Sequence, residues 1–344
     1  MNILLQVGVK NLISLQKINK GDNRTEINFH RFSKPAFLVS WAIVAVGIFS
    51  VYSNKDKILG IDFRGGEELI ASFEKEIKPE EIDECLQTEK QVGEVQHVYR
   101  SELGTGEGSS RLVLQTETGK ARDALNILNE TYPDAKLAEE GLSNIGASVS
   151  NQIKWDAVIS VLVALLGILL YVAIRFEMGF AIGAVAATVH DVAMTVGLFV
   201  LIGYLTDGAL CSGQFTAPMI ASILMIVGYS INDTIVVFDR IREELEMNPV
   251  TSLQKIITTA INRVLSRSIL TSVTTLLAAV SLWVFGAGII NDFAFVFVIG
   301  ILTGTFSSIF IASPIFFRWH KGDRKHVEDG EILPNYDWQT STTK

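Results

Sequence analysis

The sequence predicts a polytopic α-helical membrane protein with six transmembrane helices and an α+β ferredoxin-like extracytoplasmic domain between the first two helices. Of the 344 residues, 49% are hydrophobic and only 19% are charged, and the apolar residues concentrate in six blocks. Each block is about 17 to 26 residues long, enough for a helix to cross a hydrocarbon layer of roughly 30 Å. A cytosolic enzyme and a secreted domain are excluded by this composition, and an outer-membrane barrel by the unbroken apolar blocks.

The predicted spans are residues 36–52, 157–174, 179–204, 215–238, 269–285 and 293–317. Residues 1–35 and 318–344 are predicted to be cytoplasmic tails. The first apolar block has no cleavage site after it, so we interpret it as a retained anchor rather than as a signal peptide. Residues 251–265 have amphipathic helical spacing and are predicted to lie at the inner membrane surface, with a helix packed on the core as the alternative.

Lysine and arginine residues in the short connections predict the orientation, because these residues are retained on the cytoplasmic side. They occur before the first span, after the second, between the fourth and fifth, and after the sixth. The connections 205–214 and 286–292 contain neither residue. Both termini are therefore predicted to be cytoplasmic, and residues 53–156 are predicted to lie outside.

Residues 53–156 are of domain size and are predicted to fold. The expected strands are 58–63, 68–73, 95–102, 111–116 and 135–139, and the expected helices are 79–91 and 120–130. A β-α-β-β-α-β order is typical of the ferredoxin-like fold. The glycine-rich residues 104–110 lack the Lys-Ser/Thr ending of a phosphate loop and predict a hairpin turn instead.

Charge and cysteine content exclude other functions. The formal net charge of −8 argues against nucleic-acid binding. The two cysteines, Cys85 and Cys211, are too few for a disulfide framework or a zinc site and are interpreted as incidental thiols. No cofactor, metal or catalytic residue is expected.

Three ionisable residues lie within predicted spans, where a charge costs at least about 2.5 to 3.5 kcal/mol. Asp191 is near the midplane of the third span, Asp233 is near the inner end of the fourth, and Arg267 begins the fifth. Residues three, four or seven apart share a helical face. The resulting polar stripes are Thr188, Asp191 and Thr195; Ser230 and Asp233, with Asn232 beside them; and Arg267, Thr271, Thr274 and Thr275.

The three stripes are predicted to face one another across a partly hydrated seam. Small residues would let the helix backbones approach there, namely Gly183, Ala187, Gly197, Gly228 and Gly304. A desolvated carboxylate beside a permanent cation can act as a proton switch, which predicts a proton relay of Asp233, Arg267 and Asp191.

Structural roles for the same residues stay open. Asp233 and Arg267 would then form an ion pair between helices, and Asp191 would be a hydrogen-bonding group. Arg267 would extend its side chain to the membrane surface. His190 is about 100° around the helix from Asp191 and is expected to be a packed neutral imidazole.

Five motifs resemble the SecF subunits of the bacterial protein-export machinery, within the SecD/SecF family of the RND-like superfamily. They are residues 60–66 (GIDFRGG), 144–150 (NIGASVS), 175–177 with 189–192, 228–242 (GYSINDTIVVFDRIR) and 262–272 (NRVLSRSILTS). The resemblance covers about residues 33–320. Arg64 and Ala147 depart from the family pattern, where a small hydroxyl residue and a proline are usual.

The resemblance implies a location in the bacterial cytoplasmic membrane and a function in export driven by protons. The implied partners are SecD, the SecYEG channel, YajC or YidC, and translocating polypeptides. The family's functional aspartate and arginine correspond to Asp233 and Arg267. The family motif of the outer domain comprises Gly60, Asp62, Gly65 and Gly66.

The leading hypothesis is therefore an energy-coupling translocase subunit and not an enzyme. An intramembrane aspartyl protease is disfavoured, because Asp233 follows Ser230-Ile231-Asn232 rather than the Gly-x-Gly of such enzymes. A free-standing proton-coupled exporter is the other alternative. It is disfavoured because six spans are typical of half of a pseudo-symmetric transporter.

Overall fold

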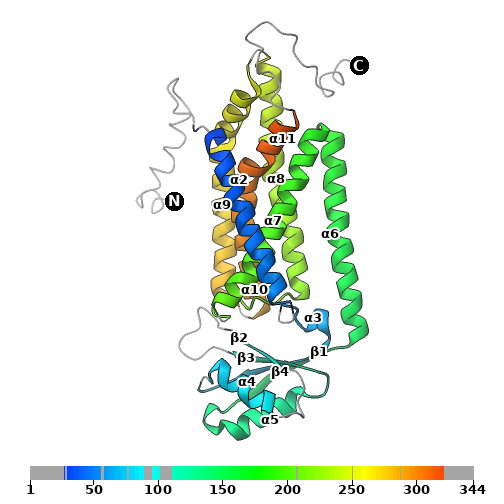
Figure 1. Cartoon of the computed structure of the whole chain (residues 1–344), viewed down its shortest axis with the longest axis vertical. Coiled ribbons are helices and arrows are strands. Elements are labelled where there is room, and N and C mark those ends of the chain that lie inside the picture. The colour runs from blue at the N-terminus through cyan, green and yellow to red at the C-terminus, as the bar shows by residue number, and fades with distance from the viewer. Residues whose placement is uncertain are drawn as a thin grey trace, which may run out of the picture.

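The computed structural model describes residues 27, 29–55, 58–75, 77–88, 95–100, 111–206, 208–249, 251–286 and 288–320. Figure 1 shows a bundle of long helices with a small sheet domain at one end. The first helix of the bundle begins, and the last helix ends, at the opposite end (Figure 1). The sheet domain is thus separated by the length of the bundle from the α6–α7 and α8–α9 connections.

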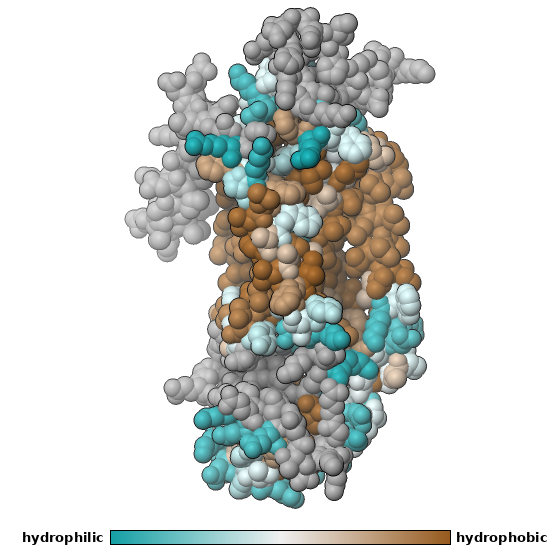
Figure 2. All heavy atoms as spheres, in the orientation of Figure 1, coloured by the Kyte–Doolittle hydropathy of each residue, from teal (hydrophilic) through white to brown (hydrophobic). Residues whose placement is uncertain are grey.

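Six helical segments of the described chain are long and apolar enough to cross a membrane, which confirms the predicted number. They are α2 (Phe29–Ser53), α6 (Ala147–Arg175), α7 (Met178–Leu205), α8 (Ala217–Met247), α9 (Leu253–Phe285) and α10 (Ile289–Ser307), the last continued by η3 (Ser308–Ala312) and α11 (Ser313–Trp319). Helix α2 begins before the predicted first span, so residues 29–35 are helical rather than part of a tail. Figure 2 shows apolar side chains around the helices and hydrophilic residues at both ends.

A π-helical turn, η3, interrupts the last span. Proline has no N–H, so Pro314 cannot donate to the carbonyl four residues earlier, and its ring crowds that carbonyl. Within the same turn, the Ser313 hydroxyl donates to the Ser308 carbonyl at 3.0 Å. Such single π turns are frequent at functional sites.

The sheet domain has the predicted β-α-β-β-α-β order. Its elements are β1 (Gly66–Ser72), α4 (Pro79–Thr88), β2 (Gln96–Arg100), β3 (Arg111–Thr116), α5 (Ala121–Thr131), the short 3₁₀ turn η2 (Pro133–Ala135) and β4 (Ala138–Ile145). The strands are all antiparallel in the order β2-β3-β1-β4. This topology confirms the ferredoxin-like class. The glycine-rich residues 104–110 lie outside the described residues.

One face of the sheet packs against α4 and α5, and the other faces the bundle (Figure 1). Leu69 of β1 pairs with Leu114 of β3 and with Leu142 of β4. Leu69 and Leu114 are fully buried beneath the helices, together with Leu128 of α5. Side chains of β1 alternate between the faces, so Glu68 points toward the bundle instead.

Two strand predictions in this domain are wrong. Residues 58–63 form a single bridge between Leu59 and Phe215, followed by the short helix α3 (Ile61–Arg64). Residues 133–135 form the turn η2, so the last strand begins only at Ala138. Gly65 (φ +77°) ends α3 just before β1, and Lys136 (φ +46°) ends η2 just before β4, so each strand begins only after a left-handed residue.

Close helix contacts in the bundle depend on glycine. A Cβ on Gly197 of α7 would lie 2.6 Å from the Gly47 Cα of α2, and a Cβ on Gly304 of α10 would lie 3.3 Å from the Ser230 Cα of α8. Gly228 was expected to serve in the same way, but a Cβ there would have no neighbour within 4 Å. The Gly228 prediction is therefore wrong.

The predicted surface helix at 251–265 is the first part of the continuous helix α9. Its apolar residues Leu253, Ile256, Ala260 and Ile261 are buried in the main hydrophobic cluster of the bundle. The apolar face thus contacts protein rather than the membrane surface, and the alternative of a core-packed helix is correct.

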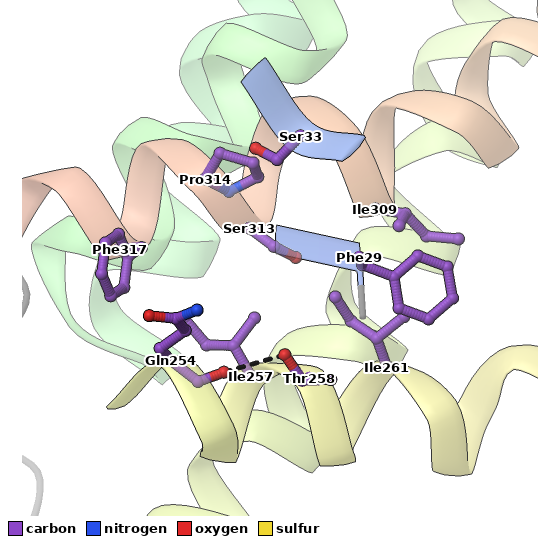
Figure 3. A pocket seen from close by; sticks show the side chains of 10 residues that line it. All are labelled: Phe29, Ser33, Gln254, Ile257, Thr258, Ile261, Ile309, Ser313, Pro314 and Phe317. Atoms are coloured by element: carbon purple, nitrogen blue, oxygen red, sulfur yellow. Dashed lines mark hydrogen bonds between the residues drawn. The ribbon is translucent and has the colours of Figure 1, made fainter. Parts of the chain in front are cut away.

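A small pocket lies at the end of the bundle away from the sheet domain, between α2, α9 and α11 (Figure 3). Its apolar lining residues are Phe29, Ile257, Ile261, Ile309, Pro314 and Phe317. The Thr258 hydroxyl, at its rim, donates to the Gln254 carbonyl of its own helix at 2.9 Å. The polar group is thus already satisfied, and the pocket holds none of the predicted relay residues.

Candidate functional site

Asp191 of α7 lies at a junction of three helices. Its Oδ2 accepts hydrogen bonds from the hydroxyls of Ser230 on α8 and Ser307 on α10, each at 2.6 Å. Its Oδ1 lies 3.1 Å from Nδ1 of the adjacent His190, which donates when that nitrogen carries the proton. Asp191 is fully buried. The carboxylate therefore connects α7 to α8 and α10.

His190 is also fully buried, and its ring packs edge-on against Trp41 of α2, with centroids 5.5 Å apart. The imidazole Nε2 has no hydrogen-bond partner among the described residues. A buried neutral imidazole was expected, but its contact with Asp191 was not. The side chains of consecutive residues meet here because both turn toward the same junction.

Asp233 of α8 forms a second junction, one helical turn from Ser230. Its Oδ1 accepts a hydrogen bond from the Ser268 hydroxyl of α9 at 2.6 Å, and its Oδ2 accepts one from the Ser308 hydroxyl of η3 at 3.0 Å. Asp233 is 8% exposed. Both of its partners are hydroxyls, which can donate or accept by rotating.

The predicted stripe of α9 does not face the other two stripes within this chain. Arg267, Thr271 and Thr274 are exposed within this chain, and no described ion pair joins Arg267 to Asp233. The residue that reaches Asp233 is Ser268, one position later and about 100° around the helix. One turn further on, the Ser272 hydroxyl lies 2.6 Å from that of Thr305 on α10.

Of the other predicted seam residues, some are buried between the helices and one is exposed. Ser230 is buried and contacts Asp191 as expected. Thr188 is buried but donates to the Ala184 carbonyl of its own helix at 2.9 Å. Asn232 is exposed, so its predicted place in the seam is wrong.

Sequence reasoning missed Ser268, Ser307 and Ser308, which supply three of the contacts to the carboxylates. Serines in apolar helices are common, so these residues carried little signal on their own. The consecutive pair Ser307-Ser308 just before Ser313-Pro314 was the available indication, because proline disturbs the preceding turn.

The outer-domain motif contacts the bundle directly. Asp62 Oδ2 accepts a hydrogen bond from the backbone N–H of Ala217, the first residue of α8, at 2.7 Å. Gly65 and Gly66 have φ of +77° and +123°, and a Cβ on Gly66 would lie 2.4 Å from the Thr116 carbonyl oxygen. Gly66 thus permits close contact of β1 with the end of β3.

Both cysteines are free thiols, as interpreted from the sequence. Cys211 lies in the connection between α7 and α8 and is 2% exposed. Burial, followed by the nearby carboxylate of Asp292, raises the pKa of the Cys211 thiol far above its usual range. Cys211 is therefore protonated and poorly nucleophilic at neutral pH.

The fold and the two junctions define a class: a multi-pass helical membrane protein with an α+β domain at one end and buried carboxylates between its helices. Residues 125–322 match the family described as "Protein export membrane protein SecD/SecF, C-terminal". The chain belongs to this family, and its role is in protein export.

Relatives and solved structures agree with this membership. The protein translocase subunit SecF of Calditerrivibrio nitroreducens is 36% identical over 306 residues, which cover 86% of this chain and 94% of that protein. That of Thermodesulfovibrio yellowstonii is 36% identical over 297 residues, covering 85% and 94%. The crystal structure of SecDF from Thermus thermophilus is 29% identical, with a TM-score of 0.73, and covers 89% of this chain. This chain spans 41% of that SecDF chain.

Proposed function

We propose that this chain works with SecD to couple proton flow across the bacterial cytoplasmic membrane to polypeptide movement through the SecYEG channel. Membership of the SecD/SecF family supports the export role. The solved relative SecDF is a translocon-associated membrane protein, and this chain corresponds to less than half of it. We infer that a separate SecD chain supplies the other half.

The observation that carries the proposal is the environment of Asp233. Among the described residues, its oxygens contact only serine hydroxyls, from α9 and from η3. A hydroxyl donates to the ionised carboxylate, and after rotation it accepts from the protonated acid. Both protonation states of Asp233 can therefore be hydrogen-bonded without a change of fold.

Arg267 supplies the cation of the proposed relay from the exposed face of α9. In the assembled pair, SecD would cover this face. A permanent guanidinium next to the junction favours the ionised form of Asp233 when the two approach and releases it when the acid is protonated. Asp191, which accepts from two serine hydroxyls and lies beside His190, is proposed to hold the helices in register.

The available energy is sufficient for a mechanical step. One proton moving down about 100 mV releases roughly 2.3 kcal/mol. A tenfold proton gradient adds about 1.4 kcal/mol. We propose that the sheet domain at the end of the bundle is the element that moves.

The proposed orientation places both termini in the cytoplasm and the sheet domain outside. The helix ends that flank the α6–α7 and α8–α9 connections, away from the sheet domain, carry basic residues, which supports this orientation; they are Arg175, Arg240, Arg242, Lys255 and Arg263. Single cysteines at Thr118 and Glu246, both exposed, test it with a membrane-impermeant thiol reagent. If only the Glu246→Cys variant is labelled in intact cells, the proposed orientation is wrong.

The decisive variant is Asp233→Asn, which keeps the volume and hydrogen bonding of Asp233 but removes the titration. The assay uses membrane vesicles that contain SecD, the channel and the Asp233→Asn variant of this chain. Release of a secreted substrate from these vesicles should not respond to an imposed proton gradient. Collapse of the gradient by an ionophore provides the baseline. Asp233→Glu remains titratable and should retain part of the response.

Asp239→Asn is the matched control, because Asp239 is an exposed carboxylate on the same helix that pairs with Arg242 at 3.1 Å. It should respond to the gradient as the parent does. A normal gradient response of Asp233→Asn would make Asp233 a structural residue. Gradient-driven transport by the purified chain without SecD would instead support the free-standing exporter.

A further inference from the structure

The backbone just before α8 is held by the sheet domain. We define residues 214–217 as the entry segment of α8. The Gly60 N–H donates to the Phe215 carbonyl at 2.9 Å, and Leu59 forms a parallel β-bridge with Phe215. A Cβ on Gly60 would lie 3.1 Å from the Thr216 Cγ2, so the absence of a side chain there permits the contact.

Asp62 caps α8 from a distant part of the sequence. The first backbone N–H groups of a helix lack partners within the helix and carry partial positive charge. Thr216, the residue at the N-cap position, makes no side-chain capping bond. The Asp62 carboxylate fills this role by accepting from the Ala217 N–H at 2.7 Å.

Side chains extend the same contact. The Phe63 and Phe215 rings pack with centroids 6.0 Å apart. The buried Gln115 amide of β3 donates to Gln214 Oε1 at 2.9 Å and to Glu68 Oε2 of β1 at 2.8 Å. The entry segment is therefore attached to the central strand β3, and through Gln115 to β1, as well as to α3.

The preceding residues are attached to the bundle instead. Trp283 Nε1 of α9 donates to the Leu210 carbonyl at 3.1 Å, and the Ser212 N–H donates to Asp292 Oδ1 of α10 at 2.7 Å. The two sets of contacts meet at Gly213, which has a φ of +68° and packs against Gly203. The first half of the α7–α8 connection is thus bonded to the bundle, and its second half is bonded to the sheet domain.

We infer that Asp62 and the entry segment of α8 form a rigid clasp through which α8 moves the sheet domain. Helix α8 carries Ser230 and Asp233, the latter roughly 24 Å from Ala217 at about 1.5 Å per residue. Two helices join the domain along the chain: α2 packs against α7 at Gly47 and Gly197, and α6 is largely exposed over its apolar stretch. Neither of them carries Ser230 or Asp233. The inference rests on the proposed function, and it makes Asp62 a positioning residue.

The test uses the full chain with SecD and the channel in vesicles. Asp62→Ala should lower the gradient-driven export about tenfold, a common size for coupling between two sites. Hydrogen exchange at the Ala217 amide should rise in the same variant, which shows that the contact has opened. Asp62→Asn, whose amide oxygen still accepts, should behave as the parent does.

Glu74→Ala is the matched control. Glu74 is an exposed carboxylate of the same domain, and it pairs with Lys136 at 2.7 Å without touching the bundle. Its loss should leave export unchanged. Equal losses in Glu74→Ala and Asp62→Ala would show a general defect of the domain and overturn the clasp.

A disulfide can replace the lost contact. In a background with Cys85→Ser and Cys211→Ser, the pair Leu59→Cys and Phe215→Cys joins bridged positions, whose spacing of about 4.8 Å suits a disulfide. Oxidation should restore export to Asp62→Ala, and reduction should abolish the rescue. A folding defect would not respond in this way.

Two outcomes would overturn the clasp: normal export by Asp62→Ala with an exposed Ala217 amide, or loss of export when the disulfide closes in an otherwise parental chain. The second outcome would mean that the contact must open during the cycle. Failure of the proposed function has a different signature, because Asp233→Asn would then export as the parent does.

Discussion

The bundle has two carboxylate junctions, one at Asp191 and one at Asp233, and they are built differently. They meet α8 about one helical turn apart, at Ser230 and at Asp233. The Asp191 junction is fully buried and contains two serines and a histidine on α7, α8 and α10. The Asp233 junction contains two serines on α9 and η3, and its aspartate remains 8% exposed. This difference in neighbours is the basis of the separate roles proposed for the two carboxylates.

The difference lies in the groups that face each carboxylate. At Asp191, the hydroxyls of Ser230 and Ser307 are joined by His190 Nδ1, which lies 3.1 Å from Oδ1. At Asp233, the partners among the described residues are two serine hydroxyls without an imidazole. Ser308 also donates to the Thr305 carbonyl of its own turn at 3.0 Å, as Ser307 of the Asp191 junction does to the Gly304 carbonyl at 3.2 Å.

The largest expected effect comes from deleting Asp191. Asp191→Ala removes the carboxylate that contacts Ser230, Ser307 and His190, and each such hydrogen bond in a membrane protein contributes about 0.6 kcal/mol. We expect a loss of about 2 kcal/mol in the free energy of unfolding, measured by denaturant titration in micelles. Asp233→Ala removes two contacts and should cost about 1 kcal/mol.

A reversed order of the two losses would contradict the division of roles. Asp191→Asn is the control for shape, because its oxygen can accept from both serines while its amide faces the imidazole. It should be close to the parent in stability. A large loss in Asp191→Asn would show that the charge itself, rather than the hydrogen bonds, stabilises the bundle.

The six spans and the order of the sheet domain could be predicted from the sequence, because length, hydropathy and alternation determine them locally. The rotation of α9 could not. Arg267, Thr271 and Thr274 form one polar face, while Ser268 and Ser272 form another beside it. Periodicity shows that both faces are polar but not which one faces the core, and the choice of the arginine face was wrong.

The contact between the sheet domain and α8 also could not be predicted. Asp62 and Ala217 are 155 positions apart, and neither has a local pattern that indicates the other. The motif around Asp62 was recognised through its family resemblance. The resemblance indicated that the motif matters but not which residue Asp62 contacts. Three-dimensional packing was required to show that this carboxylate caps a bundle helix.

A smaller effect should separate two adjacent serines. Ser307 donates to Asp191 and Ser308 to Asp233, so single alanine substitutions each remove one hydrogen bond. Each should cost about 0.6 kcal/mol in stability. Only Ser308→Ala should shift the pH at which half of the gradient-driven export is lost, because only Ser308 contacts the proposed proton carrier.

Vesicle export measured over a range of external pH distinguishes the pair. An equal shift in Ser307→Ala would mean that the two junctions titrate together, and the division of roles would then fail. No shift in either variant would remove Ser308 from the relay while leaving its structural contact intact. Ser313→Ala serves as a further control, because Ser313 stabilises the same π turn without touching either aspartate.

The smallest expected effect on stability is that of Arg267→Met. Arg267 is exposed in this chain and makes no described contact with Asp233, so its loss should change the free energy of unfolding of the isolated chain by less than about 0.5 kcal/mol. Export should nevertheless lose its response to the gradient once SecD is present, because the proposed relay then lacks its cation. Arg267→Lys should retain part of the response, since lysine keeps the charge without the planar guanidinium. A destabilised isolated chain would show that Arg267 is a structural residue of α9, whereas a normal gradient response of Arg267→Met would remove it from the relay.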